Sequence, residues 1–178
     1  MLKALLKQPL TPYAREAIRA NFKRYATTLN HDVAGTDVLL LVIMTPGSND
    51  KGSTQPMSFL FKQFGLSRGD VYDAIVAITD HSNAVSKSKR TKAVDKVFDV
   101  SKKVARARAR STRTSSDISR FDIFVALFVV YDVTFEAIME HLVADPRHEL
   151  FDAEALQKLR QKMKDEAKLP PKLTLVKS

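Results

Sequence analysis

Cysteine is absent from this 178-residue chain, and glycine is scarce, at five residues. A chain without cysteine has no disulfide and no thiolate metal site, which fits a reducing compartment. We therefore expect a cytoplasmic protein. Hydrophobic residues make up 44% of the chain and charged residues 28%, proportions typical of a globular domain rather than of a disordered or fibrous chain.

Long hydrophobic runs are also missing. The first ten residues include several leucines, but Lys3 and Lys7 divide them into pieces too short for a signal-peptide core. The apolar run DVLLLVIM at 37–44 has eight residues, whereas a membrane-spanning helix needs about 20. We therefore expect no segment that inserts in a membrane.

Signatures of catalysis and of cofactor binding are missing as well. The loop from Gly47 to Thr54 has the glycine spacing of a phosphate-binding loop, but Lys51 precedes the second glycine, and no strand comes before the loop. We interpret it as a flexible surface loop. No arrangement of serine, histidine and aspartate indicates a nucleophile, and we expect no enzymatic activity, metal or cofactor. No metal-ligand spacing relates the four histidines, which are His31, His81, His141 and His148.

Helical periodicity dominates what is present, and four helices are expected in each half of the chain. Apolar residues recur every three or four positions, and most runs follow a residue that can accept hydrogen bonds from the first N–H groups of a helix. Residues 81–90 lack this periodicity, and we interpret them as a linker. The chain is therefore predicted to be all-α. The expected helix starts are Thr11, Thr36, Pro56 and Ser67 before the linker, and Thr91, Ser119, Val133 and Asp152 after it.

The two halves are similar to each other. Thr11 aligns with Thr91 at an offset of 80 residues, and Asp37 aligns with Asp122 at an offset of 85. The additional residues of the second half fall in its arginine-rich region, at 106–117. This order predicts an internal repeat of about 80 residues. A coincidental likeness between two helical runs is the alternative.

Three ordered motifs resemble those of Clp N-terminal domains, which belong to AAA+ protein unfoldases. They are TPYAREAI at 11–18, GTDVLLLVI at 35–43 and FLFKQFGLSRGDVYDAI at 59–75. The resemblance covers about residues 8–168. It departs from the family at Asp37, where glutamate is usual, and at Arg120, which starts the pair that replaces Gly-Thr in the second half.

This resemblance implies a single domain, 1–178, in which two tandem four-helix repeats pack with pseudo-twofold symmetry. Repeat one would span about 8–80 and repeat two about 91–168, with the linker at 81–90 between them and a tail at 169–178. The implied function is a non-catalytic module that recruits substrates or adaptors to a Clp-type unfoldase or protease. Its partners would be substrate proteins, adaptor proteins or Clp ATPase and protease subunits, in a larger ATPase or as a free-standing protein.

The resemblance also implies a ligand chemistry. In some family members, the opening threonine and the motif acid of each repeat hold a phosphorylated arginine, whose guanidinium pairs with the carboxylate. The matching positions are Thr11 with Asp37 and Thr91 with Asp122. The alternative is structural: both threonines cap helices, and both acids lie in a first helical turn, where negative charge is favourable.

Positive charge is concentrated in the second half. The net charge is +9, and residues 102–113 contain basic residues but no acid. Because the arginines alternate with small residues, we expect them to spread around a helix end that enters a loop. This stretch is a solvated surface, a dock for an acidic protein, or a site for nucleic-acid phosphates; the last makes a small basic nucleic-acid-binding protein the alternative function. The basic residues are Lys102, Lys103, Arg106, Arg108, Arg110 and Arg113.

Overall fold

The computed structural model describes residues 1–31, 34–45, 61–78 and 86–168. These ranges form eight helices and contain no strand, only one isolated bridge between Leu10 and Ile118. The all-α prediction is confirmed. The helices are α1 (Leu2–Leu5), α2 (Pro12–Thr28), α3 (Thr36–Met44), α5 (Arg68–Ala77), α7 (Lys87–Thr112), α8 (Arg120–Val130), α9 (Val133–Ala144) and α10 (Ala153–Lys168).

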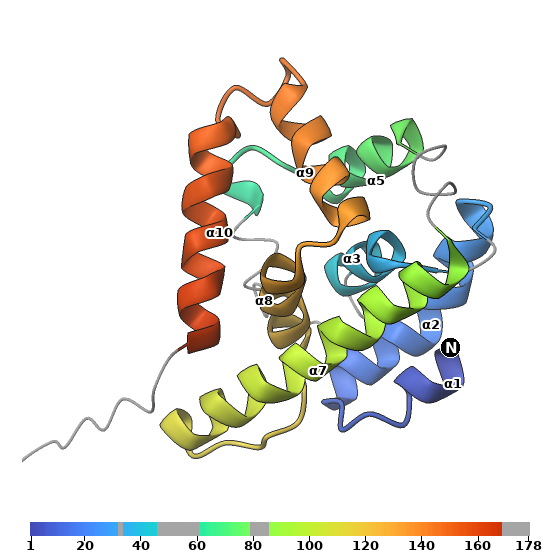
Figure 1. Ribbon diagram of the computed structural model, residues 1–178, viewed down its shortest axis with the longest axis vertical. Coiled ribbons are helices and arrows are strands. Elements are labelled where there is room, and N and C mark those ends of the chain that lie inside the picture. Colours follow the sequence, from blue (N-terminus) through green and yellow to red (C-terminus); the bar gives the residue numbers. More distant parts are fainter. Residues whose placement is uncertain (32–33, 46–60, 79–85, 169–178) are drawn as a thin grey trace, which may run out of the picture.

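Helices α3 and α8 lie side by side at the centre of the molecule, with α2 and α7 packed against them (Figure 1). Every residue of α3 is buried, and so is nearly all of α8. A helix that is apolar all round is stable in water only when other elements enclose it. The two apolar runs in the sequence therefore form the core around which the other helices are arranged.

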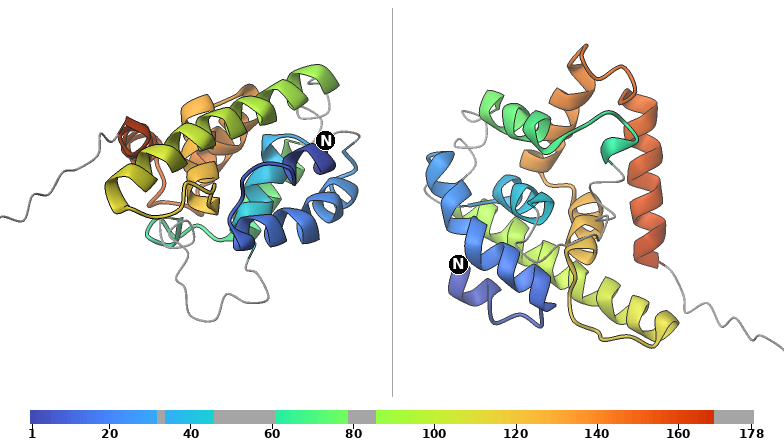
Figure 2. Two further views of the ribbon diagram at one scale, coloured as in Figure 1. Left: turned by 90° about the horizontal axis from the view of Figure 1, so that it is seen from below. Right: turned by 180° about the vertical axis from the view of Figure 1, so that it is seen from behind.

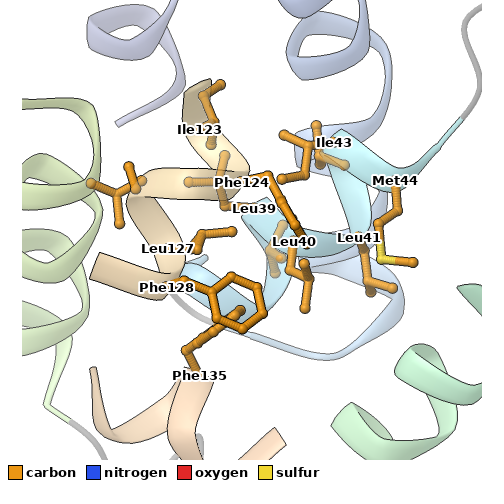
Figure 3. Close-up of a cluster of buried hydrophobic side chains, with 14 of the residues drawn as sticks. Leu39, Leu40, Leu41, Ile43, Met44, Ile123, Phe124, Leu127, Phe128 and Phe135 are labelled. Atoms are coloured by element: carbon orange, nitrogen blue, oxygen red, sulfur yellow. The ribbon is translucent and has the colours of Figure 1, made fainter. Parts of the chain in front are cut away.

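Aromatic rings join α8 to its neighbours in this core. The ring of Phe124 lies 5.4 Å from that of Phe61 and 5.1 Å from that of Phe128, in edge-to-face geometry. Phe128 in turn meets Phe135 of α9 at 5.0 Å. Figure 3 shows the rings of Phe124, Phe128 and Phe135 near the leucines of α3. Edge-to-face contacts add stabilisation beyond the burial of apolar area.

The outer helices complete the enclosure. Helix α10 packs along α8 through its two buried residues, Leu159 and Met163, on the side of the central pair opposite to α2 (Figure 2). Helices α5 and α9 pack against each other at the end of the molecule away from α1. Each outer helix thus buries one face and exposes the other, as its periodic apolar pattern predicts.

Several predicted helix starts are confirmed by their hydrogen bonds. The hydroxyl of Thr11 accepts from the Ala14 N–H at 3.3 Å, and the carboxylate of Asp152 accepts from the Ala155 N–H at 2.8 Å. At the starts of α5 and α8 a serine hydroxyl and an acid three residues later bond each other's backbone, forming capping boxes. Such reciprocal bonding fixes where a helix begins. The two pairs are Ser67 with Asp70 and Ser119 with Asp122.

Two of the residues predicted to cap helices do not cap them. Gly35 is the N-cap of α3, and the hydroxyl of Thr36 instead donates to Asp132 at 2.7 Å, across the core. Helix α7 begins at Lys87 behind Ser86, so Thr91 lies inside the helix, where its hydroxyl donates to the Lys87 carbonyl at 3.0 Å. The first turn of α7 contains no apolar residue, but it is helical because lysine and arginine are good helix formers.

The predicted linker is consequently shorter than 81–90, because residues 87–90 are helical. Residues 81–85, the loop at 47–54 and the tail at 169–178 lie outside the described residues. The predicted third helix also falls mostly outside them. Its expected end is visible at Gly65, which has a left-handed φ of 70°, a conformation that favours glycine.

Truncating the ring at the centre of the core should be severely destabilising. Phe124→Ala is expected to lower the free energy of unfolding by about 3–5 kcal/mol, because it removes buried contacts and leaves a cavity. Urea titration followed by circular dichroism measures the change. Val76→Ala, at a residue that is 48% exposed, is the control and should cost less than about 0.5 kcal/mol. Equal losses would contradict this description of the core.

Candidate functional site

Asp37 lies in the first turn of α3, completely buried. The Arg90 side chain donates to its two carboxylate oxygens at 3.2 and 3.1 Å, and Nε2 of His31 lies 3.1 Å from one of them. The Val38 N–H adds a bond at 2.8 Å. A Cβ atom on Gly35 would lie 2.9 Å from Oδ1 of Asp37. Glycine at this position therefore leaves room for the ion pair of Asp37 with Arg90.

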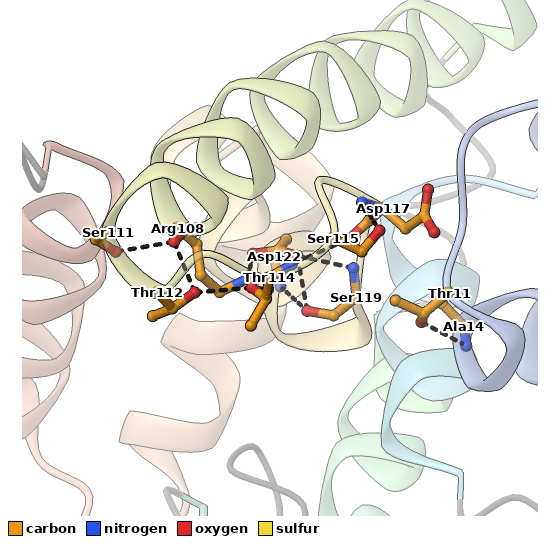
Figure 4. Close-up of polar contacts among 10 residues, drawn as sticks. All are labelled: Thr11, Ala14, Arg108, Ser111, Thr112, Thr114, Ser115, Asp117, Ser119 and Asp122. Atoms are coloured by element: carbon orange, nitrogen blue, oxygen red, sulfur yellow. Dashed lines mark hydrogen bonds and ion pairs between the residues drawn. The ribbon is translucent and has the colours of Figure 1, made fainter.

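Asp122 occupies the corresponding place in α8 and is also completely buried. Arg108 binds it with two bonds, from Nε at 3.1 Å and from Nη2 at 2.9 Å (Figure 4). The Ser119 hydroxyl and backbone N–H each donate to the same carboxylate at 2.7 Å. The hydrogen bond with Asp122 raises the pKa of Arg108. The carboxylate is thus fully engaged inside the chain.

Both arginines come from α7. Arg90 and Arg108 are 18 residues apart in the sequence, which is about five turns, so their side chains leave the same face of the helix roughly 27 Å apart. One end of α7 therefore holds the start of α3, and the other end holds the start of α8. A buried carboxylate is costly unless it is paired and hydrogen-bonded, and α7 supplies both partners.

These contacts bear on the two interpretations of the predicted ligand residues, because they show which partners the side chains have within the chain. Asp37 and Asp122 are enclosed and already bound by arginines of the same chain, so neither presents a carboxylate to an external guanidinium. Thr11 caps α2, and its N–H donates to the Ile118 carbonyl at 3.0 Å. The structural interpretation therefore fits these three residues. It fails for Thr91, which caps no helix.

The basic stretch is the C-terminal part of α7 and ends as predicted, because the helix stops at Thr112 and Arg113 follows in a left-handed conformation with φ 54°. Its arginines do not form one stripe, as expected. Arg106 and Arg110 are four residues apart and share one exposed face, whereas Arg108 points to Asp122. We define the basic row as the residues of this face, which are Lys102, Lys103, Arg106 and Arg110.

An open groove of about 620 Å³ lies between α7 and the connection from α8 to α9. We call it the lysine groove, because four lysines of α7 form one wall. Acidic side chains stand on the opposite wall, at Asp132 and Glu136, and burial raises the pKa of Asp132. The remaining lining is apolar except for Asp99. The lysines are Lys89, Lys92, Lys96 and Lys103, and the apolar residues are Ala93, Val100, Val129, Val130, Tyr131 and Val133.

The sequence itself contains a signal for this groove. Lys89, Ala93, Lys96, Val100 and Lys103 follow alternating spacings of four and three, which places them along one helical stripe. Placing the helix start at Thr91 and the linker before it concealed the stripe, because its first turn was excluded.

A smaller polar cluster lies between α5 and the loop after α9. Nε2 of the buried His148 is 3.9 Å from Asp70 and 3.8 Å from Asp145. Hydrogen bonds from Arg147 hold the pKa of Asp145 well below its usual range. Over the described ranges, no three histidine, aspartate or glutamate side chains gather closely enough to hold a metal ion.

Comparison with known proteins leaves the family open. No family model, curated protein or solved structure matches this chain. The resemblance to Clp N-terminal domains therefore rests on the three sequence motifs. Among the helices described, none combines the length and the apolar character needed to cross a membrane.

The two arginines of α7 should differ in their contribution to stability. Arg90 is 4% exposed and Arg108 is 31% exposed at its side chain. Arg90→Met is expected to cost about 3–5 kcal/mol, because it leaves a buried carboxylate without its cation. Arg108→Met should cost less, about 1–2 kcal/mol, because the Ser119 hydroxyl and N–H still donate to Asp122.

Urea denaturation of both variants tests this order. Arg106→Met removes an exposed guanidinium from the same helix and should change the free energy of unfolding by less than about 0.5 kcal/mol. If Arg106→Met were as damaging as Arg90→Met, the ion pairs would not account for the attachment of α7 to the core.

Proposed function

We propose that this chain is a non-catalytic protein-interaction module that recruits substrate or adaptor proteins to a Clp-type unfoldase or protease. The observation that carries the proposal is the lysine groove. It is an open groove whose lining combines apolar side chains, which we call its floor, with charged side chains. An apolar surface bordered by polar residues is typical of a docking site for another protein.

The Clp part of the proposal draws support from equivalent positions in the two halves. Asp37 and Asp122 align in the sequence, both begin a central helix, and both are buried against an arginine of α7. Ser67 and Asp152 also align, and both cap their helices. These correspondences favour two tandem four-helix repeats in one pseudo-twofold domain. Thr91 departs from the pattern.

Direct binding tests the proposal. The purified chain, immobilised on a biosensor, is exposed in turn to a Clp-type ATPase, to its protease subunit, to an adaptor and to chemically unfolded casein. We expect saturable binding of at least one of them. An immobilised helical protein of equal size and net charge is the control, because a charge of +9 attracts acidic proteins nonspecifically. Binding no stronger than the control for all four would contradict the proposal.

A second candidate function is nucleic-acid binding through the basic row. Its four cations lie on one face of α7, where all but the half-buried Lys102 are exposed, and no acid interrupts the sequence between residues 102 and 113. Such a row can contact successive phosphates. However, the ring of Tyr131, the aromatic residue of the adjoining groove, is covered by Arg160 at 3.6 Å. It does not offer that face for base stacking.

Salt dependence separates a specific nucleic-acid function from charge attraction. We expect weak retardation of a DNA duplex at 50 mM salt and none at 200 mM, because an affinity based on about four phosphate contacts falls about 100-fold over this range. Arg106→Glu with Arg110→Glu should abolish the weak binding. Retention of tight binding at 200 mM salt would instead favour the nucleic-acid function.

A further inference from the structure

We propose that the lysine groove receives an acidic amphipathic helix of a partner protein. This inference rests on the proposed function and deepens it, because it names the surface and the chemistry of the segment that binds there.

The α7 wall has the geometry that a second helix needs. Its lining residues recur every three or four positions over the range 89–103, so they form a straight stripe along about four turns and roughly 21 Å of the helix. Stripes with this spacing pack against a partner helix of similar length. A segment of about 15 residues would fill the groove.

The charges of the groove determine which flank of that segment carries its acidic side chains. Lys89, Lys92 and Lys96 are exposed along one wall, and the exposed Glu136 stands opposite. Asp99 also lines the groove on the α7 side, but its carboxylate lies 3.4 Å from the ammonium group of Lys102, which is not a lining residue. The fitting helix therefore carries acids on the flank that faces α7 and neutral or basic residues on the other flank.

The floor favours a protein over a nucleic acid. Val129 and Val130 are half-buried, and Val133 is 58% exposed at the start of α9. Aliphatic side chains give phosphates and sugars no stabilisation, whereas they bury well against the apolar stripe of a helix. Glu136 on the far wall would repel phosphates. An acidic helix with an aliphatic stripe satisfies the floor and the lysine wall together.

The probe is a fluorescein-labelled 16-residue helical peptide with leucines along one stripe and glutamates on one flank, measured by fluorescence anisotropy. We expect saturable binding that Lys92→Glu with Lys96→Glu weakens at least tenfold. A peptide with lysines in place of the glutamates should bind this double variant better than it binds the native protein. Binding of this lysine peptide by the double variant shows that the variant is folded.

Arg19→Glu with Lys23→Glu is the matched control. These residues are exposed on α2 at the same spacing of four, and the change in net charge is identical. Binding of the original peptide should fall less than threefold. Equal loss in the two double variants, or equal binding of the two peptides by the native protein, would overturn the inference.

The remaining outcomes separate this inference from the proposed function. One outcome is that the peptide fails to bind while the native protein and the Lys92/Lys96 variant retain a Clp component or unfolded casein equally. In that case the lysine groove is not the binding surface, and the proposed function stands. If nothing binds, both are wrong. Displacement of the peptide by a DNA duplex at 150 mM salt would identify nucleic acid as the occupant and overturn the inference.

Discussion

The rest of the structure depends on the burial of two helices, α3 and α8, that have almost no polar surface. Other helices enclose them, and the described residues form helices and no strand. Each of the two helices also carries a buried carboxylate in its first turn, at Asp37 and Asp122. A carboxylate removed from water must be paired, and this requirement sets the position of α7.

Helix α7 consequently has two faces with different tasks. The inner face carries Arg90 and Arg108, which bind the two acids at its opposite ends. The outer face carries the lysine groove and the basic row. Because the acids are satisfied internally, we place the interaction surface on the outside of α7. The helix that organises the core thus also presents the candidate binding surface.

Much of this architecture could be predicted from local sequence. Thr11, Ser67, Ser119 and Asp152 were recognisable as caps because capping depends on residues only three positions apart. The ion pairs could not be predicted, because Arg90 and Asp37 are 53 residues apart and meet only through tertiary packing. The early start of α7 at Lys87 was missed because its first turn is polar on all sides. The groove, which begins at that turn, was missed with it.

Amide NMR of the chain, titrated with the acidic helical peptide, tests most directly whether binding occurs on the outer face of α7 while the buried acids remain paired. We expect chemical-shift changes concentrated in residues 89–103 and 129–136, with little change at Gly35, Val38 or Ser119, whose amides report on the two carboxylates. Changes concentrated at those three amides, with none along the groove, would contradict it.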